Sequence, residues 1–230
     1  MKNSIVIVGC GATGSNIATF VSQLAISESK IEEIVLVDGD VVERKNFINQ
    51  KFTERDIGKN KARVLSNRFS KLGIKISYID KYLENVEELI KIIQSLTGQV
   101  ILVGSVDNNK ARRIMDTVFK SKEVPTLIYI DTGNGDKERV GQTVLGAKCD
   151  NKIIKPPVSE YFPQILVEEK EKPKKISYKC SAIEDHPQNL ATNIMSATTT
   201  FMMINNIISF NKCIRTFVNF DAEKIMMNSR

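Results

Sequence analysis

Short apolar runs alternate along the first 131 residues with stretches in which apolar side chains recur every three or four positions. A run rich in β-branched residues predicts a strand buried on both faces, and the helical spacing predicts an amphipathic helix. The predicted strands are residues 5–8, 34–37, 74–79, 100–103 and 127–130, and the predicted helices are residues 17–24, 59–72, 84–95 and 109–119. Because parallel strands need a crossover connection, this alternation predicts an α/β fold with a doubly wound, mostly parallel, Rossmann-like sheet.

The second part of the chain has a different pattern. Residues 139–147 predict a further strand, and residues 148–179, with four prolines and a run of mixed charge, predict a flexible crossover loop. An apolar stripe over residues 188–210 predicts a long C-terminal helix, and short antiparallel strands are expected around residues 221–222. All 230 residues are expected to form one domain.

Composition narrows the functional class. Hydrophobic residues make up 42% and charged residues 26% of the chain, as expected for a globular protein. The net charge is +6, but basic and acidic residues are interspersed, which argues against nucleic-acid binding. Residues 186–211 contain no aspartate, glutamate, lysine or arginine, yet they are too polar for a membrane span. The four cysteines form no C-x-x-C pair, so we expect reduced thiols, no zinc ribbon and a cytoplasmic location.

A glycine-rich turn follows the first predicted strand. Gly9, Gly11 and Gly14 form the pattern G-x-G-x-x-G at a junction between strand and helix, where bare backbone lets a phosphate approach the helix N-terminus. Asp38 ends the second predicted strand, where a carboxylate can accept hydrogen bonds from ribose hydroxyls. The combination predicts a nucleotide-binding site.

The segment after Asp38 carries further motifs. Asp38 and Asp40 form Asp-x-Asp, Asn46 and Gln50 follow, and residues 56–61 read Asp-Ile-Gly-Lys-Asn-Lys. This arrangement resembles the ThiF/MoeB/ubiquitin-activating-enzyme superfamily. Segments at residues 106–108, 131–134 and 180–193 extend the resemblance, the last of them to the small phage- and plasmid-type members.

The resemblance implies an ATP- and Mg²⁺-dependent adenylyltransferase that activates the C-terminal carboxylate of a small ubiquitin-like or sulfur-carrier protein with a glycine tail. It implies that Gly11 approaches the ATP phosphates, Lys61 contacts phosphate and Asp107 holds magnesium, so that Lys61 and Asp107 are the catalytic candidates. The cofactor-binding set that it implies is Gly9, Gly11, Gly14, Asp38, Asp40, Asn46, Asn49, Gln50, Lys61, Asp107 and Asn108. A homodimer is also expected, because members of the superfamily commonly dimerise.

One position departs from the superfamily pattern. Asn49 stands where an arginine usually precedes the glutamine, and an amide offers neither positive charge nor a bidentate fork to a phosphate. Lys51, Arg44, Arg112 or a second subunit are the candidate sources of the missing charge.

A cysteine is a candidate acceptor for the activated acyl group, because a thiolate is a far better nucleophile than a hydroxyl near neutral pH. We predict Cys180, beside the expected long loop, as the catalytic thiol. Cys10 lies inside the glycine turn and Cys213 in a predicted strand, so both are expected to be structural, and Cys149 stays a lesser candidate.

Two alternatives remain at this stage. A nicotinamide-dependent oxidoreductase would also use Asp38, but it leaves Asn46, Gln50, Lys61 and Asp107 without a role. A non-catalytic scaffold that binds a nucleotide or a partner would explain Asn49 as lost chemistry.

Overall fold

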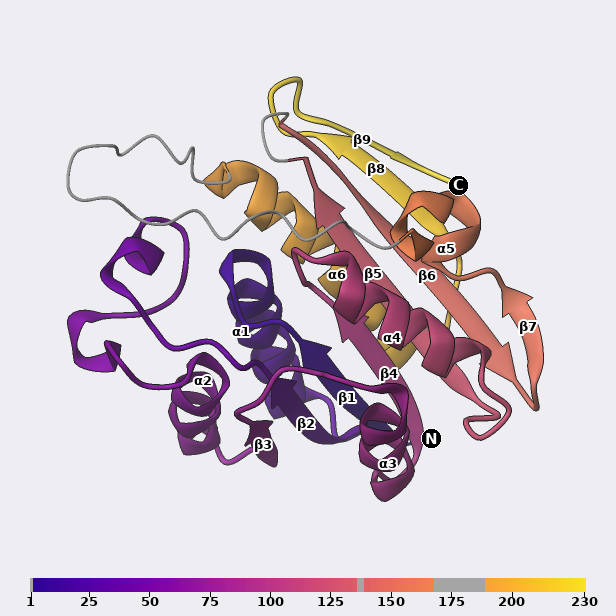
Figure 1. The fold of residues 1–230 in the computed structure, drawn as a ribbon, viewed down its shortest axis with the longest axis horizontal. Helices are drawn as coiled ribbons and strands as arrows, with labels where there is room; N and C mark the ends of the chain where they lie inside the picture. Colours follow the sequence, from indigo (N-terminus) through magenta and orange to yellow (C-terminus); the bar gives the residue numbers. More distant parts are fainter. Residues whose placement is uncertain (1, 136–138, 168–188) are drawn as a thin grey trace.

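The computed structural model describes residues 2–135, 139–167 and 189–230. It contains one nine-stranded sheet in the order β3-β2-β1-β4-β5-β6-β8-β9, with β7 paired to β6 (Figure 1). Strands β1 to β5 run parallel to one another, and β6 to β9 pair in antiparallel fashion. The predicted α/β class, with its mostly parallel sheet and short C-terminal antiparallel strands, is confirmed.

The parallel half is built from alternating strands and helices. Its strands are β1 (Asn3–Val8), β2 (Ile31–Val37), β3 (Ile76–Ile79), β4 (Gln99–Gly104) and β5 (Leu127–Asn134). Its helices are α1 (Ala12–Ser27), α2 (Lys61–Phe69), α3 (Val86–Ser95) and α4 (Asn109–Lys120), with 3-10 turns η1 (Arg44–Ile48), η2 (Glu54–Asp56) and η3 (Ser70–Leu72). Each helix crosses over the sheet between two strands.

The C-terminal half closes the fold with β6 (Val140–Cys149), β7 (Lys152–Lys155), α5 (Val158–Tyr161), η4 (Pro163–Leu166), α6 (Leu190–Phe210), β8 (Phe217–Asp221) and β9 (Met226–Ser229). The prediction of a flexible loop covered residues 148–179. Of these, residues 148–167 are described, and they contain the end of β6, β7, α5 and η4. Pro156 and Pro157 lie between β7 and α5, and Pro163 begins η4. The composition alone does not distinguish this arrangement from a loop. Residues 168–179 lie outside the described part.

Two apolar layers sandwich the sheet. In β1, Ile5 and Ile7 pack with α1, α2 and α6, whereas Val6 and Val8 pack with α3 and α4 on the opposite face. Side chains alternate between the two faces of a strand, so both faces of β1 are apolar over residues 5–8. Within the described ranges, no helix has the length and apolarity needed to cross a membrane.

Candidate functional site

A cleft of about 630 Å³ opens at the carboxyl ends of the parallel strands. The strand order reverses between β1 and β4, because the chain winds outward in both directions from β1. Ligands of open α/β sheets bind at such a reversal. The lining comes from the ends of β1, β2 and β5 and from the segments that follow β1, β2, β3 and β4.

The glycine turn forms one wall of the cleft. Gly9 has a positive φ of 91°, and a β-carbon on Gly14 would overlap with the carbonyl oxygen of Gly9 and lie 2.7 Å from Oγ of Ser105. The turn therefore packs directly against the segment that follows β4, and Ser105 donates a 2.8 Å hydrogen bond to the Gly9 carbonyl. By contrast, nothing lies within 4 Å of the position that a Gly11 β-carbon would take, and this residue borders the open cleft.

Helix α1 begins at this wall without a side-chain cap. The N-cap residue is Gly11, which has no side chain to accept a hydrogen bond. The other helices of eight or more residues in the described part are capped by asparagines, Asn60, Asn85, Asn108 and Asn189, each of which accepts a backbone hydrogen bond. Because uncapped N–H groups and the positive end of the helix dipole attract anions, the start of α1 is suited to a phosphate.

Asp38 follows β2 and lies directly beside the glycine turn. One carboxylate oxygen accepts the backbone N–H of Cys10 at 2.6 Å, and the other accepts that of Asp40 at 2.7 Å. Burial raises the pKa of the Asp38 carboxyl, although both backbone hydrogen bonds act in the opposite direction. The side chain is thus fixed at the cleft, with lone pairs left to accept further hydroxyl donors.

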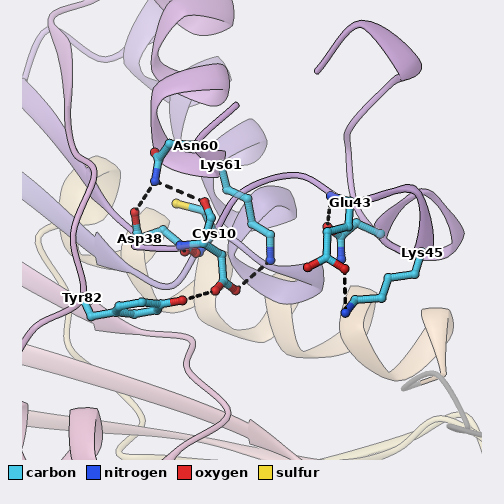
Figure 2. A network of polar contacts seen from close by, with 9 residues as sticks. Cys10, Asp38, Glu43, Lys45, Asn60, Lys61 and Tyr82 are labelled. Carbon is cyan, nitrogen blue, oxygen red and sulfur yellow. Dashed lines mark hydrogen bonds and ion pairs between the residues drawn. The ribbon is translucent and has the colours of Figure 1, made fainter. Parts of the chain in front are cut away.

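Asp40 bridges the side chains of Lys61 and Tyr82, both of which are labelled in Figure 2. One oxygen pairs with Nζ of Lys61 at 2.9 Å, and the other accepts a short hydrogen bond from the Tyr82 hydroxyl. Burial alone would raise the pKa of Asp40, but these hydrogen bonds and the Lys61 charge lower it. The same hydrogen bond to Asp40 raises the pKa of Tyr82 to about 12.

Lys61 is held in place by the start of α2. Only 6% of the residue is exposed, and its backbone N–H donates to the carbonyl of Asp40 at 2.9 Å. Asn60, the N-cap of α2, donates its amide hydrogens to the carbonyls of Asp38 and Asp40 at 2.7 and 3.1 Å. The Asp-x-Asp segment and the start of α2 therefore form one hydrogen-bonded unit, which aims the ammonium into the cleft.

Replacing Tyr82 with phenylalanine is expected to raise the pKa of Asp40, because the carboxylate loses a donor that favours its charged form. The lowered pKa of Asp40 stabilises the fold above the pKa of an unfolded aspartate, and this contribution disappears as the pH falls through the folded value. The stability gap between Tyr82→Phe and the wild type should therefore close at low pH.

Titration of the Asp40 carboxyl carbon by NMR measures the shift directly. Tyr78→Phe is the matched control, since Tyr78 lies in β3 and is absent from the cleft lining. An unchanged pKa of Asp40 in Tyr82→Phe would contradict the coupling.

The loop between β4 and α4 carries the second acidic group. Asp107 is exposed at the cleft and has no hydrogen-bond or ion-pair partner among the described residues. Asn108 beside it caps α4 by accepting the N–H of Ala111 at 2.9 Å. A carboxylate without a described partner at this cleft fits Mg²⁺, which is commonly bound by one or two carboxylates together with substrate phosphates and water.

Arg112 also borders the cleft, but its charge is already engaged. Its guanidinium donates to the Val106 carbonyl at 2.7 Å and lies 3.4 Å from the carboxylate of Asp131. Burial raises the pKa of Asp131, whereas the Arg112 charge and the hydrogen bond from Tyr129 favour its ionised form. Arg112 thus compensates a buried acid at the end of β5.

A polar network closes the end of the cleft nearest α6. The side-chain oxygen of Asn193 accepts hydrogen bonds from Asn134 at 2.7 Å and from Thr13 at 3.3 Å, and Ser196 donates to Asn134. Three distant segments, α1, β5 and α6, are joined here.

The cleft brings together most of the predicted cofactor-binding set. Its lining includes Gly9, Gly11, Asp38, Asp40, Asn49, Gln50, Lys61, Asp107 and Asn108. Gly14 and Asn46 are not in the lining. Gly14 allows the close packing of α1 on the turn, and Asn46 accepts the backbone N–H of Glu43 at 2.8 Å, so both shape the walls instead. Cys180 lies outside the described residues.

Sequence reasoning did not single out Thr13, Lys81, Tyr82, Ser105 and Lys110, which also line the cleft. Lys81 and Tyr82 follow β3, and Ser105 and Lys110 follow β4. Ligands of parallel sheets bind at the carboxyl ends of the strands, so the segments that follow the predicted strands could have indicated these residues.

The described thiols differ in their environment. Burial raises the pKa of Cys10 far above its usual range, and burial also raises that of Cys213. Both are therefore poor sources of thiolate. Cys213 lies between α6 and β8 rather than in the predicted strand, because β8 begins only at Phe217. Cys149 is exposed at the end of β6 and is absent from the cleft lining.

Comparison with protein families matches residues 1–229 to the ThiF family. The human ubiquitin-like modifier-activating enzyme 6 is 28% identical to the chain over 164 residues, a region that covers 69% of this chain and 14% of the enzyme.

Among solved structures, E. coli MccB with ATP superposes with a TM-score of 0.66 at 19% identity, and MccB with AMPCPP and MccA gives 0.65 at 18%. PaaA gives a TM-score of 0.67 at 17% identity. The matches cover 99% of this chain and 63% of each solved chain, so the protein spans less than two thirds of these relatives. At this identity the likeness supports the fold.

Proposed function

Since this chain belongs to the ThiF family, we propose that it is an adenylyltransferase that uses ATP and Mg²⁺ to activate a carboxylate of a peptide or carrier protein. The single observation that carries this proposal is the uncapped start of α1, which faces the cleft between the buried Lys61 and the exposed Asp107. This arrangement suits a polyphosphate, and the carboxylate of Asp38, beside the glycine turn, suits a ribose.

In the proposed reaction a carboxylate oxygen of the substrate attacks the α-phosphorus of ATP. The new bond is an acyl phosphate bond, the bond between the α-phosphorus and the bridging oxygen breaks, and pyrophosphate leaves with the electron pair. The backbone N–H groups at the start of α1 and the ammonium of Lys61 stabilise the phosphate charge. Asp107 would hold magnesium, which neutralises phosphate charge when it is bound. No nucleophile from the protein is required.

The names of the related proteins guide the choice of substrate. The human relative is a modifier-activating enzyme, and MccB was crystallised with MccA. The specific substrate that we propose is a small ubiquitin-like or sulfur-carrier protein whose C-terminal glycine tail enters the cleft near Asp107 and the end of β5. A cytoplasmic homodimer completes the proposal, and light scattering coupled to size exclusion measures the oligomeric state.

Transfer of the acyl group to a thiol forms a thioester and releases AMP. We assign Cys180 as the acceptor, because the described Cys10 and Cys213 have raised pKa values and Cys149 is absent from the cleft. An adduct with the substrate that hydroxylamine cleaves, and that persists in Cys149→Ser and is lost in Cys180→Ser, would support this step. Persistence of the adduct in Cys180→Ser would refute the assignment.

Binding of ATP tests the proposal before the substrate is known. A ligand that binds only the folded state raises its stability by RT ln(1 + [L]/Kd). The melting temperature should rise with ATP and Mg²⁺ and not with NAD. Stabilisation by NAD alone would instead favour the oxidoreductase alternative.

Asn49 favours one second candidate, a scaffold that binds nucleotide without chemistry, because this uncharged residue lines the cleft. Formation of acyl-adenylate, detected as exchange of labelled pyrophosphate into ATP in the presence of candidate tails, separates the two functions. Tight ATP binding with no exchange for any tail would support the scaffold.

A further inference from the structure

The charges that line the cleft balance one another. Its cationic side chains are Lys61, Lys81, Lys110 and Arg112, and its anionic side chains are Asp38, Asp40, Glu84 and Asp107. A triphosphate therefore needs cations that are not already neutralised by a neighbour. Lys61 is paired with Asp40, and Arg112 is paired with Asp131. Part of the positive charge of each is therefore already compensated before a phosphate binds.

Of the candidates suggested by sequence for the charge missing at Asn49, the three side chains of this chain do not serve. Arg44 pairs with Glu54 at 3.1 Å on an exposed face, and neither Arg44 nor Lys51 belongs to the cleft lining. Arg112 is held by Val106 and Asp131. The structure therefore directs attention to Lys81 and Lys110, which have no hydrogen bond or ion pair with any described residue.

Position in the sheet distinguishes these two lysines. Lys81 follows β3, which is separated from β1 by β2. Lys110 follows β4, which is the direct neighbour of β1. The segment that joins β4 to α4 packs on the glycine turn through Ser105 and Val106. Lys110 thus stands on the side of the cleft where the start of α1 would hold phosphate.

The location of Lys110 within α4 points the same way. It lies in the first turn of the helix, near Arg112 and Arg113, and this turn contains no acidic residue. Cations are unfavourable at the positive end of a helix dipole, and α3 of the same fold places Glu87 and Glu88 there instead. A bound anion would offset this repulsion.

We propose that Lys110 binds the β- and γ-phosphates of ATP and supplies the positive charge that Asn49 does not. The inference rests on the proposed function and adds a binding residue that the motifs do not contain. The phosphates beyond the α-position become the pyrophosphate leaving group, so the same ammonium stabilises the charge that develops on it.

The test compares ATP with AMP, each with Mg²⁺, by isothermal titration calorimetry. Lys110→Met should raise the Kd for ATP about tenfold or more, since a charged hydrogen bond is worth about 1.5–3 kcal/mol. The Kd for AMP should stay within about twofold, a shift of roughly 0.4 kcal/mol. Lys122→Met, which removes an equal charge from an exposed site beyond α4, should leave both affinities unchanged. Without nucleotide, Lys110→Met should melt at or above the wild-type temperature, because it relieves repulsion at the helix start.

Restoration of charge at position 49 provides the rescue. Asn49→Arg introduced into Lys110→Met should recover most of the lost ATP affinity. The same Asn49→Arg introduced into Lys122→Met, which has lost no charge at the cleft, should raise ATP affinity less. Equal losses for ATP and AMP, a loss confined to Lys81→Met, or no rescue by Asn49→Arg would overturn the assignment. If the wild-type protein does not bind ATP, the proposed function fails as well, whereas ATP binding that Lys110→Met leaves intact refutes this inference alone.

Discussion

Lys61→Ala is expected to weaken ATP binding about 10- to 100-fold, the loss that corresponds to one charged hydrogen bond of about 1.5–3 kcal/mol. The reason is twofold. The ammonium is buried and aimed into the cleft, and its removal leaves the carboxylate of Asp40, which the Tyr82 hydroxyl keeps ionised, facing the phosphates. Calorimetric titration with ATP and Mg²⁺ measures the change.

Two variants separate these contributions. Lys59→Ala removes an exposed lysine of the same segment, whose ammonium donates to the Arg55 carbonyl, and should not alter ATP affinity. Adding Asp40→Asn to Lys61→Ala removes the stranded carboxylate, so binding should recover in part and remain below that of the wild type. Full recovery would mean that Lys61 only neutralises Asp40, and an unimpaired Lys61→Ala would remove Lys61 from the site.

The second large effect concerns the glycine turn. Gly14→Ala should lower the free energy of unfolding by about 3 kcal/mol, because overpacking in a close-packed region typically costs 1–3 kcal/mol and here the new methyl group meets backbone. The obstacle is the Gly9 carbonyl, which accepts the hydrogen bond from Ser105 and would overlap with the new methyl group. Urea denaturation measures the loss.

Gly11→Ala is the matched variant. Its β-carbon would meet no protein atom within 4 Å, so the protein should fold with nearly wild-type stability. The methyl group would nevertheless stand at the start of α1, where the phosphate approaches, and the Kd for ATP should rise about tenfold, which corresponds to about 1.4 kcal/mol. Loss of stability in Gly11→Ala, or undiminished ATP affinity, would contradict the assignment of this helix start to phosphate.

The sequence by itself determined the scaffold. Uninterrupted apolar runs such as residues 5–8 can only be satisfied by burial on both faces, and helical spacing between them requires crossovers, so the α/β class and its parallel core follow from local pattern. The glycines and Asp38 sit at the ends of these strands, and the carboxyl ends of parallel strands share one edge. Their presence at one cleft was therefore predictable.

Only the tertiary structure decided which polar groups remain available in that cleft. The sequence around Arg112 does not indicate that this arginine pairs with the buried Asp131. The sequence around Asp40 likewise does not indicate that Tyr82, which follows β3, donates a hydrogen bond to it. Asn46 fits the family pattern, but its side chain accepts the Glu43 N–H at the start of η1 and does not line the cleft. Lys110 fits no pattern, but it lines the cleft. Whether two charged side chains pair depends on the distance between them across the sheet, and the packing of segments remote in sequence sets that distance. This packing therefore decides which charges of the cleft remain unpaired and available to a ligand.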